Sequence, residues 1–315
     1  MLFRSGDETS DSGFLLTGKP RRGWERIREV LVGTAGRKAV VEDRLQQILN
    51  GIEPSLTWFH NIAGGAKWGW SEVMIKIARE HAPVLWTLHD MWAIGDSGES
   101  YWQEDSVVES GRRQEAGGRK VEELKGLGVE EDKSLRLTRV CGADGKYSVT
   151  LTAPSKWLTE LTFKITGQQC VHLPNPIDRD LFSPGDQREA RRQLGLPEKG
   201  MLVLAGADSL QDPRKGFDLL QEAWARIRSE DATLALFGRH GVTRPGQVYL
   251  GNLVSDSDMV AAYRAADLYV HPARMENAPC TIQESLACGT PVAAFRVGGI
   301  PEMVKDGRNG ILAAS

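Results

Sequence analysis

Apolar runs and helical spacings alternate through the second half of the chain. The runs predict buried strands at MLVLAG (201–206), TLALFG (233–238), VYLG (248–251), DLYVHPA (267–273) and PVAAF (291–295). Apolar residues three or four positions apart predict helices at 216–230 and 256–266, another helix begins near Pro279, and IPEMV (300–304) follows the last strand. Strands that alternate with helices form βαβ units, so a parallel sheet covered on both faces is expected.

The first half shows the same alternation less regularly. Strands are predicted at 55–59, 83–88 and 148–153, and helices at 71–81 and 155–165. Prolines punctuate the polar segment 172–184, where we place a domain join, giving two doubly wound α/β domains at 1–178 and 179–315. Residues 96–147 are rich in glycine and charge with weak periodicity, which fits a long insert, a partly disordered loop or a functional lid.

Composition narrows the class of protein. Of 315 residues, 41% are hydrophobic and 26% are charged, as in ordinary globular proteins. The net charge of −3 gives no reason to expect a nucleic-acid partner. No apolar run approaches the roughly 18 residues of a membrane span, and the amino terminus lacks a signal-peptide pattern. The four cysteines are widely spaced without metal-type pairing, so a reduced, cytoplasmic location is expected.

One segment suggests contact with a membrane surface. Residues 18–38 carry seven basic and two acidic side chains, with Trp24, Ile27 and Leu31 on one helical stripe. Such a helix docks on anionic lipid, here the inner face of the plasma membrane, or is a solvated surface helix.

Candidate chemistry lies where strands end, because open parallel sheets bind ligands at their carboxyl edges. His60 and Asn61 follow one predicted strand, and His89 follows the next. His271 and Glu276 occupy the corresponding position in the second half. Each histidine is also compatible with a packing role.

The stretch 275–295 has a more specific logic. A helix that begins near Pro279 leaves its first N–H groups, around Cys280 to Ile282, free to bind a diphosphate. The Glu284 carboxylate on that helix can accept hydrogen bonds from a ribose diol, and Glu276 ahead of it from a second sugar. The alternative is an ordinary helix with an exposed glutamate at each end.

Two cations precede another predicted helix start. Arg214 and Lys215 lie before a helix that begins at Gly216 or Phe217, where the helix dipole also favours anions. A solvated turn is the alternative.

These segments together resemble the family-4 retaining glycosyltransferases, nearest the branch of colanic-acid and exopolysaccharide biosynthesis. Residues 276–313 look like the donor-binding segment, with E-x7-E, ACGTPV, GGIPE and G-x-NG in order. WTLHDMW, LTAPSKWLTE, LPNPID and DPRKGFDLLQEA match the same family. The likeness runs from about residue 50 to 315, with a gap over the insert.

The resemblance implies the GT-B fold, in which two Rossmann-like domains face each other across a cleft. It implies transfer of a sugar, with retention, from a nucleotide-diphosphate sugar to a glycan or lipid-linked acceptor. Glu276 would contact the donor sugar and Glu284 the ribose. Lys215 would neutralise the diphosphate, which backbone N–H groups near Cys280 and Thr281 would also bind.

The first domain would supply the remaining groups. The resemblance implies that His89 faces the donor sugar, so that His89 and Glu276 are the candidate catalytic residues. His60, Asn61 and Trp68 are the candidate acceptor-side residues. Trp68 and Trp70 could stack on acceptor sugars or pack in a core.

Several features depart from the family pattern. Ala207 stands where an arginine is often found, and Arg214 or Arg239 could substitute for it. No Asp-x-Asp element is evident, so no metal cofactor is expected if cations and a helix N-terminus stabilise the leaving diphosphate.

The ends of the chain also differ from the pattern. Its opening resembles the family's second strand, so an incomplete first domain without the terminal helices is expected. A non-catalytic or degenerate nucleotide-sugar-binding fragment is therefore the alternative function. A sugar-nucleotide epimerase on the same fold is a third interpretation.

Overall fold

The computed structural model describes residues 39–60, 73–91, 93–94, 137, 140–142, 145–227, 229, 231–241 and 244–314. The chain divides into two compact units, residues 1–154 with 158–173 and residues 155–157 with 174–315. We call them the amino-terminal and the carboxy-terminal unit. Asn61, Trp68, Trp70, the segment 18–38 and nearly all of the predicted insert lie outside the described residues.

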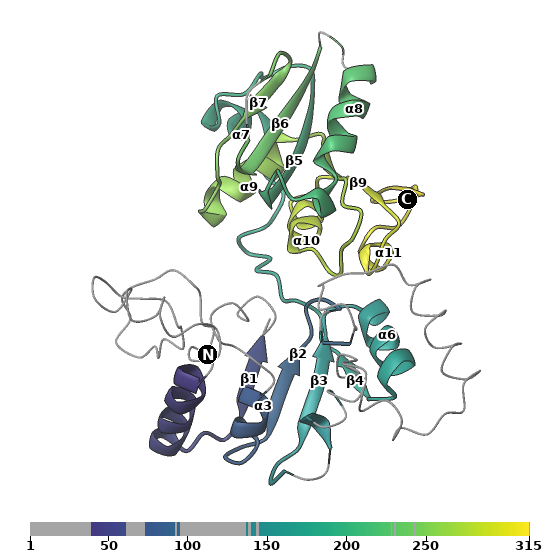
Figure 1. Cartoon of the computed structure of the whole chain (residues 1–315). Helices are drawn as coiled ribbons and strands as arrows, with labels where there is room; N and C mark the ends of the chain where they lie inside the picture. Colours follow the sequence, from purple (N-terminus) through teal and green to yellow (C-terminus); the bar gives the residue numbers. More distant parts are fainter. Residues whose placement is uncertain are drawn as a thin grey trace, which may run out of the picture. The chain divides into compact units, whose positions relative to one another are not determined.

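The carboxy-terminal unit is built on a six-stranded sheet in which every neighbouring pair is parallel (Figure 1). The order of the strands is β10-β9-β8-β5-β6-β7. Their bounds are β5 (Met201–Ser209), β6 (Ala232–Arg239), β7 (Gln247–Tyr249), β8 (Leu268–His271), β9 (Val292–Phe295) and β10 (Gly310–Ala313). The five strands predicted in this half are confirmed, whereas β10 was not predicted because its four residues follow a polar turn directly.

Alternate residues of the central strands pack into two separate hydrophobic cores. Leu202 and Leu204 of β5 point into a larger core that also contains residues of α7 (Gln187–Gln193), α9 (Asp256–Ala265) and α10 (Cys280–Ala287). Val203 and Ala205 point the other way, against α8 (Phe217–Ile227). This period of two places helices on both faces, as predicted for a doubly wound sheet (Figure 1).

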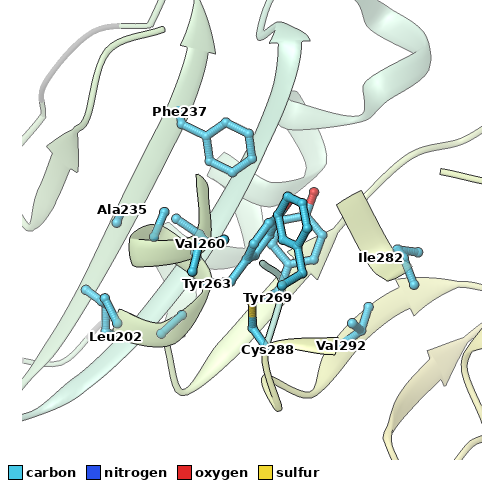
Figure 2. Close-up of a cluster of buried hydrophobic side chains, with 14 of the residues drawn as sticks. Leu202, Ala235, Phe237, Val260, Tyr263, Tyr269, Ile282, Cys288 and Val292 are labelled. Atoms are coloured by element: carbon cyan, nitrogen blue, oxygen red, sulfur yellow. The ribbon is translucent and has the colours of Figure 1, made fainter. Parts of the chain in front are cut away.

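Three aromatic rings form the centre of the larger core (Figure 2). Tyr263 of α9 packs edge-on against Phe237 and Tyr269, with ring centroids 6.4 and 5.6 Å apart. Edge-to-face pairs at such distances are favourable beyond the area that they bury. They fix α9 on the strands that lead to the candidate site.

Local sequence explains where the helices of this unit begin. The Ser255 hydroxyl accepts from the Asp258 amide and so caps the start of α9. Asp186 caps α7 in the same way. Asp212 caps the 3₁₀ turn η3 (Pro213–Lys215), and Gly216 then takes a left-handed conformation. The helix α8 therefore begins at Phe217, one of the two predicted starts.

Two short helices complete the carboxy-terminal unit. The helix α7 was not predicted, because its seven residues QREARRQ carry almost no apolar periodicity. The segment IPEMV forms the single turn α11 (Ile300–Met303). Its proline lies in the first turn, where an N–H group would have no acceptor within the helix, so the missing N–H costs no hydrogen bond.

The amino-terminal unit contains a second parallel sheet, of order β1-β2-β3-β4. Its strands are β1 (Thr57–His60), β2 (Val84–Thr87), β3 (Val149–Ala153) and β4 (Cys170–His172). The predicted helices appear as α3 (Val73–Ala78) and α6 (Lys156–Thr166), and residues 39–52 are also helical. The strand β4 was not predicted, since three residues carry too little pattern. Among the described residues, no helix is both long and apolar enough to cross a bilayer.

Replacing Leu204 by alanine should lower the free energy of unfolding of the carboxy-terminal unit by about 2–5 kcal/mol, because it leaves a cavity in the larger core. The matched control is Met201→Ala on the same strand, where the side chain is 49% exposed rather than 0%. We expect that control to cost less than about 1 kcal/mol. Urea denaturation of the full chain measures both, and equal losses would contradict the placement of Leu204.

Candidate active site

The loop between β8 and α10 brings Glu276 against Lys215. The Lys215 Nζ lies 2.5 Å from Glu276 Oε2, and the glutamate is only 9% exposed. The two residues are 61 positions apart in the sequence. Two of the predicted donor-site residues are therefore joined by an ion pair at the carboxyl edge of the sheet.

The meeting of these residues depends on how tightly η3 lies on the β8–α10 loop. A Cβ at Gly216 would lie 1.8 Å from the carbonyl oxygen of Pro272, so only glycine permits this approach. The Arg274 amide donates to the Arg214 carbonyl at 2.8 Å, and the Arg274 guanidinium forms an ion pair with Asp218 at 2.5 Å. These contacts place Lys215, one residue before Gly216, beside the loop that carries Glu276.

A pair of adjacent glycines, Gly298 and Gly299, also packs on the loop that carries Glu276. The Gly299 amide donates to the Asn277 carbonyl at 3.0 Å. A Cβ at Gly298, where φ is +52°, would lie 1.8 Å from the Glu276 carbonyl oxygen. The GGIPE element of the sequence therefore has a structural reason: its backbone packs directly on the backbone of the glutamate loop.

The charge of Glu276 is strongly stabilised. Burial by itself raises the pKa of this carboxyl, but His271 and Lys215 outweigh burial and lower the pKa to about 2. A depressed folded-state pKa stabilises the fold above the pKa of the unfolded chain, and this contribution is lost as pH falls toward 2. At neutral pH Glu276 is a carboxylate that accepts hydrogen bonds only.

His271 lies beneath the ion pair, at the end of β8. It is 4% exposed, and its Nε2 is 3.4 Å from Glu276 Oε2. Among the described residues this nitrogen forms no hydrogen bond of ordinary geometry, although it lies close enough to Glu276 to help lower the pKa of that carboxyl. The other ring nitrogen, Nδ1, lies 3.4 Å from the Tyr269 hydroxyl.

The helix α10 begins where the sequence predicts, with Pro279 at its N-cap. The Ile282 amide, however, donates to the Pro279 carbonyl at 3.2 Å, so the prediction that it is free for a ligand is wrong. The tight first turn uses that donor. The amides of Cys280 and Thr281 precede the first position that can bond within the helix, which leaves them as the candidate diphosphate donors.

Glu284 lies one turn further along α10. Its Oε2 accepts a hydrogen bond of 2.8 Å from the Tyr263 hydroxyl. Burial raises the pKa of Glu284, the Tyr263 hydrogen bond opposes that rise, and the charge of Asp256 adds to it. The tyrosine leaves Oε1 to accept bonds from a diol, which is the geometry that the predicted ribose contact requires.

Both predicted arginines already have carboxylate partners. Arg214 Nη2 lies 2.6 Å from Asp212 Oδ2, and Arg239 pairs with Asp208. The Arg214–Asp212 pair is partly exposed and the Arg239–Asp208 pair is more exposed, so a phosphate can compete for each guanidinium. Lys215 remains the more buried cation of this edge.

The amino-terminal unit places two of its predicted histidines together. His60 at the end of β1 and His89 after β2 form a hydrogen bond of 2.9 Å between Nδ1 and Nε2. Burial lowers the pKa of His60, and burial with the charge of His60 lowers the pKa of His89 to about 4. Both rings are therefore neutral at pH 7, and His89 suits hydrogen bonding to a hydroxyl better than stabilisation of a negative charge.

The sequence patterns did not reveal the buried groups behind the two glutamates. Tyr263 and Tyr269 read only as apolar positions of a helix and a strand, and both are fully buried. Their roles depend on contacts 21 and 63 residues away, to Glu284 and to the Gly206 carbonyl. Among the described residues, no group of three or more His, Cys, Asp or Glu side chains is arranged to hold a metal ion.

Gly298→Ala should destabilise the chain more than Gly307→Ala does. Both glycines have positive φ, which costs an alanine about 1–2 kcal/mol, but a Cβ at Gly307 would meet nothing within 4 Å. At Gly298 the Glu276 carbonyl must also move. Urea denaturation compares the two variants, and equal losses would contradict the close approach of the GGIPE loop.

Tyr263→Phe should raise the pKa of Glu284 further, because it removes the hydrogen bond that opposes the effect of burial. A ¹³C-detected titration of the glutamate carboxyl groups measures this change. Tyr269→Phe is the matched control, since it removes a buried hydroxyl that bonds the Gly206 carbonyl instead. The same shift in both variants would contradict a specific role for Tyr263.

Comparison with known proteins places this geometry in a family context. Residues 200–315, which hold the ion pair, α10 and Glu284, match the family described as "Glycosyl transferases group 1". The D-inositol 3-phosphate glycosyltransferase of Stackebrandtia nassauensis is 30% identical over 209 residues, which are 58% of this chain and 47% of that protein. The chain thus spans about half the length of this curated relative.

Solved structures extend the likeness to both units. The crystal structure of Anabaena Alr3699/HepE in complex with UDP aligns with a TM-score of 0.60 and 18% identity, over 90% of this chain and 70% of that one. HepE in complex with UDP-glucose aligns at 0.58 and 17%, over 86% and 68%. At such identities the likeness concerns the fold. The chain has the GT-B fold, and its residues 200–315 match the model of the family "Glycosyl transferases group 1".

Proposed function

We propose that this chain is a retaining glycosyltransferase that moves a hexose from a nucleotide-diphosphate sugar to a glycan or lipid-linked acceptor in polysaccharide biosynthesis. One observation carries the proposal. Lys215 and Glu276 meet beside the N-terminus of α10, and Glu284 follows on the same helix. The set provides a cation, two carboxylates and free backbone amides at the carboxyl edge of a parallel sheet, where such ligands bind.

Each group has a role that fits the bond that breaks. Departure of the nucleoside diphosphate builds negative charge on its oxygens and positive charge on the anomeric carbon. Lys215 and the amides of Cys280 and Thr281 stabilise the departing diphosphate, with Arg214 and Arg239 as further cations. The Glu276 carboxylate accepts from hydroxyls of the transferred sugar, and Glu284 accepts from those of the ribose.

The amino-terminal unit contributes the remaining groups in this proposal. His89 bonds a hydroxyl of the donor sugar as a neutral imidazole, and His60, Asn61 and Trp68 serve the acceptor. No metal takes part, because Lys215 and the helix N-terminus supply the positive charge that a divalent cation would otherwise bring. The reaction belongs at the cytoplasmic side, with peripheral contact to anionic lipid through residues 18–38.

Two findings bear on the donor and the acceptor. HepE, which shares the fold, has been solved with UDP and with UDP-glucose. These ligands make UDP-glucose the first donor to test. The relative from Stackebrandtia is named for transfer to D-inositol 3-phosphate, so a phosphorylated cyclitol joins glycans and lipid-linked sugars among the acceptors to test.

Lys215→Met and Glu284→Ala should each weaken binding of UDP-glucose roughly 10- to 100-fold, because each removes a charged hydrogen-bond partner of the ligand. Glu276→Gln should reduce transfer more than it reduces nucleotide binding. The matched control is Lys305→Met, an exposed lysine whose Nζ bonds the Pro301 carbonyl. Calorimetry measures binding, and product analysis with the acceptor panel measures transfer and anomeric configuration.

The outcomes separate the alternatives. Unchanged nucleotide affinity in Glu284→Ala would contradict the ribose assignment, and loss of transfer in EDTA would contradict metal independence. Binding without turnover on any acceptor would favour a non-catalytic nucleotide-sugar binder. Isomerised donor formed without an acceptor would favour an epimerase.

A further inference from the structure

The Glu276 carboxylate has two cationic or potentially cationic neighbours at the same oxygen. Lys215 Nζ lies 2.5 Å from Oε2, and His271 Nε2 lies 3.4 Å from it. The lysine forms the bond, whereas the histidine nitrogen is buried without a hydrogen-bond partner among the described residues. An orphaned buried ring nitrogen is costly to keep unless another state of the molecule uses it.

Binding of the donor would change the balance between these neighbours. The inference rests on the proposed function, in which Lys215 neutralises the diphosphate. If Lys215 moves toward the two phosphates, its ion pair with Glu276 is weakened. The glutamate is 90% or more buried, so it needs another cation if its charge is to persist.

The surroundings of His271 fit a doubly protonated ring. The Tyr269 hydroxyl oxygen lies 3.4 Å from His271 Nδ1 and 3.3 Å from the Gly206 carbonyl oxygen. When its hydroxyl donates to that carbonyl, its oxygen has a second lone pair that can accept from Nδ1–H beside the contact with the Thr281 side chain. The imidazolium then donates from Nδ1 to Tyr269 and from Nε2 to Glu276, and both N–H groups are satisfied.

The other titratable groups near the ring leave this arrangement intact. Tyr269 stays neutral near pH 7, since burial raises its pKa well above neutrality. Glu284 accepts a hydrogen bond from Tyr263, whose ring packs against Tyr269. A carboxylate at Glu284 would favour, not oppose, a positive charge on His271.

We infer that His271 is a positioning residue for Glu276: it takes up a proton from solvent and holds the carboxylate when Lys215 turns to the donor diphosphate. The exchange keeps Glu276 charged and in place for the transferred sugar. It makes donor binding dependent on a proton that neither the donor nor Lys215 supplies.

A competing arrangement gives the opposite result. Lysine has three N–H donors, so Lys215 could bridge Glu276 and the diphosphate without releasing either. No proton would then be taken up. Proton uptake therefore distinguishes the exchange from a bridge.

The main experiment is calorimetry of UDP-glucose binding to the full chain near pH 7.5, in buffers of different ionisation enthalpy. UDP-glucose is a suitable probe because its diphosphate, esterified at both ends, keeps its charge through neutral pH. We expect uptake of up to one proton per bound donor. His271→Gln retains a donor near the Nε2 position but cannot titrate, so this variant should bind UDP-glucose without proton uptake.

Two further variants separate positioning from mere packing. His271→Phe fills the space without a donor and should weaken UDP-glucose binding roughly 10- to 100-fold, since Glu276 loses its replacement partner. His240→Asn changes an exposed histidine of the same unit and should leave affinity and proton uptake unchanged. Partial recovery of affinity in His271→Gln relative to His271→Phe identifies the hydrogen bond as the cause.

A ligand-free measurement tests the same exchange independently. In Lys215→Met the charge of Glu276 is no longer neutralised, so the His271 ring should become protonated at higher pH than in the parent chain. NMR titration of labelled histidine rings follows this change, with His271→Gln assigning the signal. An unchanged titration in Lys215→Met overturns the inference.

The remaining outcomes are equally decisive. Binding of UDP-glucose without proton uptake, or uptake that survives in His271→Gln, overturns the inference while the proposed function stands. If UDP-glucose, GDP-glucose and ADP-glucose all fail to bind, the proposed function fails and the inference fails with it.

Discussion

The buried ion pair between Lys215 and Glu276 is the constraint on which the candidate site depends. A carboxylate that is 9% exposed keeps its charge because His271 and Lys215 offset the effect of burial, and Lys215 comes from a turn 61 residues earlier. Lys215 and Glu276 can meet only if the backbone segments around them lie very close to each other. The glycines at 216 and 298 allow this approach, since a Cβ at either position would overlap a carbonyl oxygen of the β8–α10 loop. Charge and close packing are thus one requirement in this part of the molecule.

Much of the fold was predictable because strongly periodic segments fix both the type of element and the burial of its faces. Strands β5, β6, β8 and β9, and helices α8 and α9, were predicted from their apolar spacing. The helix at residues 39–52 escaped prediction although Val41, Leu45 and Leu49 lie four positions apart on its buried face. The other elements that escaped prediction are short or polar: β4, β10 and the charged helix α7. Their stability comes from neighbours in the sheet and in the larger core, which a window of sequence does not contain.

The position of the candidate site was predictable from the sequence, but the contacts within it were not. The spacing of Glu276, Glu284 and Pro279 located the helix start, and the motif order assigned a role to Lys215. Spacing did not predict that the Ile282 amide donates to the Pro279 carbonyl. It also did not predict that two tyrosines and a histidine lie behind the glutamates. These features arise from long-range contacts between β5, β8, α9 and α10. A pattern along the chain carries no information about which buried hydroxyl faces which carboxylate.

The separation of the two cores has a consequence for how this protein could be altered. The larger core holds Tyr263, Tyr269 and Ile282, which lie directly against the groups of the candidate site. The smaller core, between α8 and the opposite face of β5 and β6, contains none of the residues that back the glutamates. Cavity-filling changes for thermal tolerance can therefore be placed on a face whose core contains none of the candidate site residues. Substitutions that probe the candidate site belong on the other face, where each change affects both the core and the groups of the site.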